Sequence, residues 1–210
     1  KLDGVDASGL ELMMLAHYMN DKEYINEVIN GDIHTTNQIA AGLASRDESK
    51  TFIYAFIYGA GSKKIGSIIG GSERDGERIK EKFLRATPSL RRLREKVERV
   101  AQRRWVRGLD QRKIIIRHPH AALNTLLQGA GACVMKKALT LLQEYVINKQ
   151  IKAFPVVNVH DEFQYEVQED RADEFGRLAV QSIIDAGQQL NVRCQLNGEY
   201  KIGNNWSETH

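Results

Sequence analysis

The segment RDESKTFIYAFIYG, residues 46–59, places a charged or aromatic side chain at every fourth position. On an α-helix, that spacing puts the repeated side chains on one face. Two cations come first and two aromatic rings follow: Arg46, Lys50, Tyr54 and Tyr58, with Gly59 directly after them. Because a nucleoside triphosphate presents a chain of phosphates followed by a flat base, this order of side chains indicates a helix that binds a triphosphate along its length.

Ser45 and Glu48 have the S-x-x-E spacing of a capping box, which predicts a helix over residues 46–58 whatever that helix binds. An arginine–lysine pair four residues apart is also common on a solvated helix face, and tyrosines within an apolar run are common in a core. The pattern alone therefore leaves both interpretations open.

A second informative segment is VDASGLELMMLAH, residues 5–17. Asp6 follows a short apolar run, and Ser8 and Glu11 again have capping-box spacing, so we expect a helix from about Gly9. Asp6 would then lie at a strand-to-helix junction with its carboxylate exposed. A purely structural role for Glu11, reaching back to the start of the helix, explains that residue equally well.

The third segment, VVNVHDEFQYEV over residues 156–167, has two β-rich runs that flank His-Asp-Glu. This pattern predicts a hairpin with His160, Asp161 and Glu162 at its tip. Charges at a hairpin tip are commonly solvated turn residues. Alternatively, Asp6 and Asp161 are two strand-end carboxylates that hold hard cations through oxygen ligands. Two such ions, roughly 3.5–4 Å apart, assist phosphoryl transfer.

Together, these segments resemble the family A DNA polymerases, the bacterial DNA polymerase I type. DASGLEL (6–12) is similar to the family's motif A, residues 46–59 match the motif B pattern R-x-x-x-K-x-x-x-[FY]-x-x-x-Y-G, and VHDE (159–162) matches motif C. HAALNTLLQGAGA (120–132) resembles the primer-template-binding helix, and GDIHTTNQIAA (31–41) resembles a fingers segment that contacts phosphate. The segments follow the family's order, cover nearly the whole chain and most resemble the replicative polymerases of short-tailed phages.

The resemblance implies an α+β fold in which a palm sheet carries a helical fingers insertion, without thumb or exonuclease domains. The expected division is palm over 1–20, fingers over 21–112 and palm again over 113–210, with the primer-template helix at 120–149 and the motif C hairpin at 153–168. The other expected helices are 22–30, 33–43, 63–69, 73–86, 88–107 and 170–188, and the other expected strands are 2–6, 113–117 and 192–201.

The resemblance also implies the site residues. Asp6 and Asp161, with the backbone carbonyl of Ala7, would hold two Mg²⁺ ions, and Lys50 would join these aspartates in catalysis. Glu11 and Tyr54 would exclude a ribose 2′-hydroxyl. The implied nucleotide-binding residues are Ala7, Ser8, Gly9, Leu10, Glu11, His34, Arg46, Lys50 and Tyr54. The implied DNA-binding residues are Tyr58, Arg112, His120, Asn124, Gln128 and His160.

The implied partners are primer-template DNA and dNTPs. Motif A begins within the first few residues, whereas a thumb and the first palm strands precede it in the family. We therefore expect a complementary polypeptide that carries the thumb and N-terminal palm, with or without an exonuclease. Met13 stands where the family usually has Arg, so one contact to the primer side is lost or supplied from elsewhere.

The net charge of +3 conceals an uneven distribution. Residues 51–120 contain 18 Lys/Arg and 7 Asp/Glu, a net of +11, and the remainder has a net of −8. A basic middle is typical of a DNA-facing surface, although solvated helices also carry such charges. Cys133 and Cys194 lack metal or disulfide spacing, and no apolar run approaches the roughly 18 residues of a membrane span. We expect no membrane partner and a location in the cytoplasm of a bacterium or phage-infected host cell.

Three other functions remain open at this point. A single-subunit RNA polymerase would select ribose. A non-catalytic DNA-binding subunit would keep the polymerase shape without the reaction. A two-metal nuclease would use the carboxylates but would not need the triphosphate-binding helix.

Overall fold

The computed structural model describes all residues 1–210 and divides into two compact units. The sheet unit contains Lys1–Met14 and Gly129–His210, and the helical unit contains Leu15–Gln128. The boundary between them falls within helices α1 (Leu10–Met19) and α8 (Ala122–Asn148).

The sheet unit is built on a four-stranded antiparallel sheet of order β4-β5-β1-β6. Its strands are β1 (Leu2–Ala7), β4 (Ala153–Val159), β5 (Glu162–Val167) and β6 (Gly198–Gly203). The first strand of the chain therefore lies between two strands from its end, and β4 and β6 form the sheet edges. The unit also contains η2 (Glu169–Arg171), α9 (Ala172–Gln189) and α10 (Trp206–Thr209).

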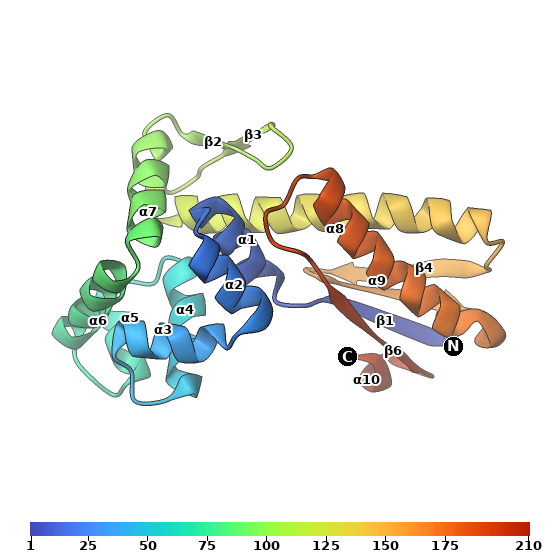
Figure 1. The fold of residues 1–210 in the computed structure, drawn as a ribbon, viewed down its shortest axis with the longest axis horizontal. Coiled ribbons are helices and arrows are strands. Elements are labelled where there is room, and N and C mark those ends of the chain that lie inside the picture. Colours follow the sequence, from blue (N-terminus) through green and yellow to red (C-terminus); the bar gives the residue numbers. More distant parts are fainter. The chain divides into compact units, whose positions relative to one another are not determined.

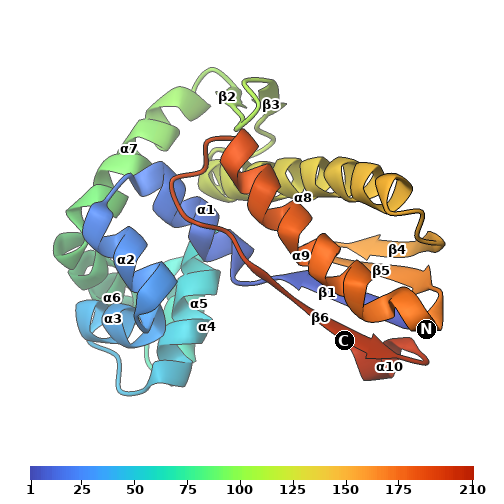
Figure 2. The same cartoon turned by 45° about the vertical axis from the view of Figure 1, so that its right-hand side comes forward.

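Helix α9 runs along one face of this sheet (Figures 1 and 2). Small and apolar residues recur along it with helical spacing, which produces an apolar stripe that packs on the sheet. Phe175 is fully buried, and its ring lies 5.0 Å from that of Tyr165 on β5. Tyr145 of α8 donates a 2.5 Å hydrogen bond to Asp185 of α9 and joins these two helices. On β5, Glu162 and Gln164 alternate with these apolar residues, are buried, and contact His210 and Thr209.

The helical unit begins its helices at strong local signals. Ser45–Glu48 and Ser72–Asp75 form complete capping boxes, and Pro88 occupies the first turn of its helix. The helices are α2 (Lys22–Asn30), α3 (Ile33–Ala41), α4 (Arg46–Ile57), α5 (Ser62–Ile68), α6 (Glu73–Ala86), α7 (Pro88–Ala101) and the 3₁₀ turn η1 (Pro119–Ala121).

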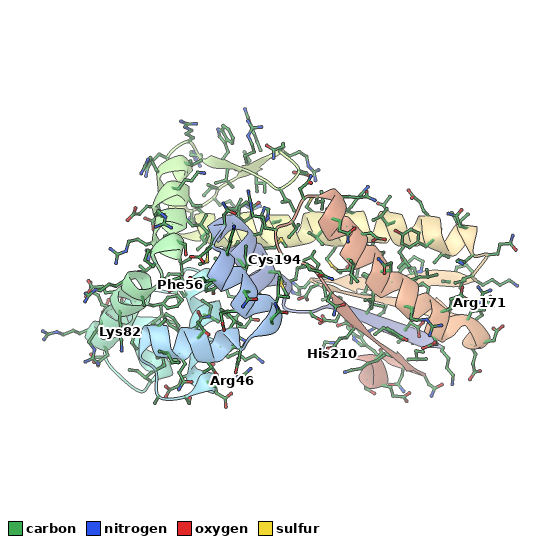
Figure 3. All side chains as sticks on the ribbon, in the orientation of Figure 1. Arg46, Phe56, Lys82, Arg171, Cys194 and His210 are labelled. Carbon is green, nitrogen blue, oxygen red and sulfur yellow. The ribbon has the colours of Figure 1, made fainter.

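Three phenylalanines form the centre of this unit's core. The rings of Phe52 and Phe56 on α4 both lie edge-on to Phe83 on α6, at centroid distances of 5.1 and 5.6 Å (Figure 3 labels Phe56). Phe52 and Phe83 are fully buried. One side of α4 is thus fixed by packing, whereas Arg46 and Lys50 on its other side are exposed.

The expected mixed helix-and-sheet class is confirmed, three local predictions are wrong, and one short helix was not predicted. The helix expected over 88–107 ends at Ala101, and Trp105–Arg107 forms strand β2 instead. The strand expected over 113–117, within the palm, spans Lys113–Ile115 as β3 and pairs with β2 in a separate two-stranded sheet. The last strand spans Gly198–Gly203 rather than 192–201, and α10 was not predicted.

The predicted Ser8 cap is also wrong. Gly9 has φ +58°, outside the helical region, and its carbonyl accepts the first helical hydrogen bond from Met13. Gly9 is therefore the N-cap residue and α1 begins at Leu10.

Candidate active site

Two of the predicted carboxylates meet in the sheet unit. Asp6 lies near the end of β1, opposite Glu162 of β5, and Asp161 lies in the two-residue turn between β4 and β5. The backbone N–H of Ala7 donates to the carbonyl of Asp161 at 3.0 Å. The preceding turn residue, His160, has φ +55°. This turn brings Asp161 next to the end of the central strand.

The environment of Asp6 is strongly negative. Partial burial, followed by the charges of Asp161, Glu162 and Glu199, raises the pKa of Asp6 to about 6, and His210 opposes the rise. Carboxylates that repel each other at the same end of a sheet are stabilised by a bound cation. The arrangement thus favours binding of positive charge beside Asp6.

The carboxylates near Asp6 can bind Mg²⁺ only if water or substrate supplies most of the other ligands. No group of three or more His, Cys, Asp or Glu side chains is placed to hold a metal ion, so an all-protein cage is absent. Mg²⁺ is commonly bound by one or two carboxylates and completes its coordination with water and substrate phosphates. Asp6 and Asp161 fit that open arrangement.

The sequence does not predict the hydrogen-bond partners of Glu162, the residue that follows Asp161. His210 Nδ1 lies 2.7 Å from Oε2 of the buried Glu162, and Lys201 Nζ donates to the His210 carbonyl at 3.3 Å (His210 is labelled in Figure 3). Gln164 donates to the other Glu162 oxygen and accepts from Thr209 at 2.9 Å. These contacts join α10 to the strand that follows Asp161. No local pattern links residues 48 positions apart, although Glu162 itself stands in the hairpin motif.

The predicted phosphate-binding residues gather in the helical unit. Arg46 donates from Nε to Asp32 at 2.7 Å, and Asp32 caps α3, which carries His34 (Arg46 is labelled in Figure 3). The His34 ring lies 6.4 Å from the Tyr54 ring. Partial burial, then the charge of Arg46 and finally that of Lys50 lower the pKa of His34, against the effect of Asp32. Arg46 and Tyr54 of α4 therefore lie beside the start of α3, which carries His34.

Several predicted DNA-binding residues also lie in this unit. Gln128 donates to the Tyr58 hydroxyl at 3.4 Å, and Gly59 approaches the His120 carbonyl closely. The Asn124 Oδ1 atom is buried without a hydrogen-bond partner. Arg112 does not join them: it forms an ion pair with Asp110 in the β2–β3 turn.

The remaining predicted residues belong to the sheet unit. His160 is exposed on the hairpin turn, and Ser8 donates from its backbone to the Asn197 carbonyl at 3.1 Å. Glu11 lies in the first turn of α1, and the buried Leu10 packs against Gly131 of α8. Within this segment, Leu10 has a packing role, which leaves Glu11 as the polar candidate.

Comparison with solved structures defines the class. The fold is that of a polymerase domain: it matches the "POL domain of Pol1 from M. smegmatis complex with DNA primer-template and dNTP" with a TM-score of 0.87 at 19% identity. The match covers 99% of this chain and 40% of that one. No helix of the chain is long and apolar enough to cross a membrane.

The chain belongs to DNA polymerase family A, whose model matches residues 1–208. The DNA-directed DNA polymerases of Enterobacteria phage T3 and Escherichia phage T7 are each 42% identical to it over 99% of its length. The thermostable DNA polymerase I of Thermus filiformis is 28% identical over 97%. The chain spans about a third of the length of the two phage relatives, 33% of each.

Proposed function

We propose that the chain carries out template-directed DNA synthesis by deoxynucleotidyl transfer, as part of a family A polymerase. The meeting of Asp6 and Asp161 at neighbouring strand ends supports this proposal most directly. In it, the sheet unit acts as the palm and the helical unit acts as the fingers.

Asp6 and Asp161, with the Ala7 carbonyl, hold two Mg²⁺ ions in this proposal. When bound, such ions activate the attacking primer oxygen and stabilise the charge that develops on the leaving pyrophosphate. Removing the carboxylate charge while keeping the side-chain shape therefore abolishes extension. DNA binding remains, because neither aspartate is needed to hold the phosphate backbone.

The α4 face binds the incoming nucleotide. Arg46, Lys50 and His34 neutralise the triphosphate, and Tyr54 lies against the sugar and base. Positive charges that are already held next to the triphosphate stabilise the negative charge that develops in the transition state. They lower the activation free energy of nucleotidyl transfer, because the protein does not have to rearrange during the reaction. Glu11 and Tyr54 exclude the ribose 2′-hydroxyl, which makes the enzyme prefer dNTPs. The primer-template is contacted by the predicted DNA-binding residues: Tyr58, Arg112, His120, Asn124, Gln128 and His160.

A complementary polypeptide with the thumb and N-terminal palm completes the enzyme, which works in the cytoplasm of a bacterial or phage-infected cell. The edge strand β4 supports this part of the proposal, since Phe154 is 63% exposed and Val156 is 59% exposed. An apolar edge strand is a surface that another chain segment commonly covers.

Primer extension with dNTPs and Mg²⁺ tests the proposal, first with the chain alone and then with a polypeptide that supplies the thumb and first palm strands. We expect extension in the mixture. Asp161→Asn should abolish it, whereas Asp170→Asn, an exposed carboxylate in the same unit, should not. DNA binding without extension in the full mixture would instead identify a non-catalytic subunit.

Sugar selection is tested in the same assay by comparing dNTPs with NTPs. Glu11→Ala should slow extension and reduce the preference for dNTPs. An unchanged preference would remove Glu11 from sugar selection, and a wild-type preference for NTPs would indicate an RNA polymerase.

A further inference from the structure

Glu162 lies beside both aspartates of the candidate active site. It follows Asp161 directly and pairs with Asp6 in the register of β1 against β5. Side chains of directly paired residues on neighbouring strands lie on the same sheet face, with their Cβ atoms about 5 Å apart. Nevertheless, no group of three or more His, Cys, Asp or Glu side chains is placed to hold a metal ion. A carboxylate within reach of the two aspartates is therefore not arranged as a third ligand.

Both oxygens of the Glu162 carboxylate already have partners within the sheet unit. Oε2 lies 2.7 Å from Nδ1 of His210, and Oε1 accepts from Nε2 of Gln164. Because an ionised carboxylate can only accept, Nδ1 of His210 carries the hydrogen in this contact. The Glu162 side chain is 11% exposed, whereas that of His210 is 71% exposed. A cation at Glu162 would therefore compete with two internal donors for a largely buried carboxylate.

The two donors are themselves held by helix α10. Thr209 donates to Oε1 of Gln164 at 2.9 Å, which turns the amide nitrogen of Gln164 toward Glu162. The ring of His210 lies edge-on to that of Trp206, at a centroid distance of 6.1 Å (Figure 3 labels His210). Thr209 thus orients one donor of the Glu162 carboxylate, and Trp206 packs against the other.

Strand β1 has room for this network because it carries a glycine there. Gly4 pairs with Gln164 in the β1–β5 register. A Cβ atom at position 4 would collide with Nε2 of Gln164 and lie 2.5 Å from the Thr209 carbonyl oxygen. Any larger residue would force the amide or α10 to move. The network therefore packs directly on the central strand, two residues before Asp6.

We propose that His210 and Gln164 are positioning residues that hold the Glu162 carboxylate away from the metal ions of Asp6 and Asp161. This inference rests on the proposed function, in which those two aspartates bind Mg²⁺. Mg²⁺ usually binds one or two carboxylates and completes its octahedral coordination with water and substrate phosphates. A third carboxylate would take a position that the incoming triphosphate needs. Holding Glu162 keeps that position open for the substrate.

Mn²⁺ binding, followed by the electron paramagnetic resonance signal of the free ion, tests this role without DNA, nucleotide or catalysis. His210→Ala removes the donor to Oε2 and should release Glu162 as a third ligand. Mn²⁺ should then bind at least 5-fold more tightly than to the parent chain. The titration is made at pH 8, where Asp6, with a pKa of about 6, is ionised. Equal affinities of the two chains would overturn the proposal.

A double-variant cycle separates the release of Glu162 from the loss of the His210 side chain itself. In a Glu162→Gln background, His210→Ala should change the Mn²⁺ affinity less than 2-fold, because no carboxylate remains to be released. A gain that persists in this background would show that His210 acts through its own charge. That result would overturn the positioning role.

Three further variants test the hydrogen bonds. His210→Asn should keep the parent affinity, since Nδ2 of asparagine is bonded to Cγ as Nδ1 of histidine is and also donates. Gln164→Met removes the donor to Oε1 in a side chain of similar length and should tighten Mn²⁺ binding, as His210→Ala does. His118→Ala removes an exposed histidine from the helical unit and is the matched control. Equal gains for His118→Ala and His210→Ala would overturn the proposal.

These titrations compare free chains, so their outcome is distinct from that of the polymerase assay. Primer extension by Asp161→Asn would contradict the proposed function. Equal Mn²⁺ affinities of the parent chain and His210→Ala would contradict only the positioning of Glu162.

Discussion

Arg46 Nε lies 2.7 Å from Oδ2 of Asp32, and the Oδ1 atom of the same carboxyl group caps α3 by accepting from the His34 and Thr35 backbones. One carboxylate therefore holds a proposed phosphate ligand and positions the helix that carries another. Because Asp32 is itself an anion, it also competes with a triphosphate for Arg46.

Asp32→Asn should tighten triphosphate binding. Asparagine keeps the helix cap, because it is as good an N-cap residue as aspartate, but it removes the competing charge. Exposed ion pairs contribute little because water and salt screen them, so we expect a gain of at most about 5-fold in affinity. Titration with a fluorescent dNTP at low salt measures it. Asp47→Asn, which removes an unpaired charge from the same helix turn, is the control, and an equal gain there would contradict the competition.

Asp3 should make the chain less stable as the pH rises. It is fully buried, neither carboxylate oxygen has a hydrogen-bond partner, and burial raises its pKa to about 7, with Asp173 adding to the rise. The folded state therefore holds a proton that the unfolded state releases near pH 4, and stability falls between about pH 4 and 7. Asp3→Asn should remove an effect on the order of a few kcal/mol.

Urea unfolding at pH 5 and pH 8 measures that slope. Asp6, whose pKa is also raised, should leave a smaller slope of the same sign in the Asp3→Asn variant. Glu166→Gln removes an exposed carboxylate from β5 and should leave the full slope. If Asp3→Asn and Glu166→Gln behave alike, Asp3 is not the titrating group.

Gly59→Ser should damage the joint after α4. Gly59 has φ +78°, and an added Cβ would lie 2.7 Å from the His120 carbonyl oxygen. A non-glycine residue in the left-handed region costs roughly 1–2 kcal/mol before that contact is counted. We expect a lower melting temperature and weaker primer-template binding. Gly61→Ser, in the same joint with no atom within 4 Å of its Cβ position, should be close to neutral.

Local sequence signals predict secondary structure correctly where the stabilising contacts lie within one short segment. The Ser45–Glu48 capping box located the start of α4 correctly, because both of its hydrogen bonds lie within four residues. The α7 prediction failed past Ala101, because Trp105–Arg107 is held by pairing with Lys113–Ile115 rather than by its own periodicity. Strand structure depends on a partner that the local sequence does not contain.

The candidate site shows the same limit. The sequence motifs identified Asp6 and Asp161 as separate strand-end carboxylates, and only the register of β1 against β5 brings them together. The contact between Glu162 and His210 joins positions 48 residues apart, so no spacing rule could predict it. The residues missed are those whose role depends on tertiary structure alone.

His210→Ala should raise the pKa of Asp6 further. Asp6 already titrates near pH 6 because of partial burial and three neighbouring carboxylates, and His210 is the group that opposes the rise. In the His210→Ala variant, a larger fraction of Asp6 is therefore protonated at pH 6.5 than in the parent chain. Above about pH 8, Asp6 is ionised in both variant and parent. Carboxyl ¹³C NMR of the metal-free chain follows this titration. His160→Ala removes a histidine that does not affect Asp6 in this way, so it should leave the curve unchanged. Superimposable Asp6 curves for His210→Ala and the parent chain would show that His210 does not contribute to the charge balance around Asp6.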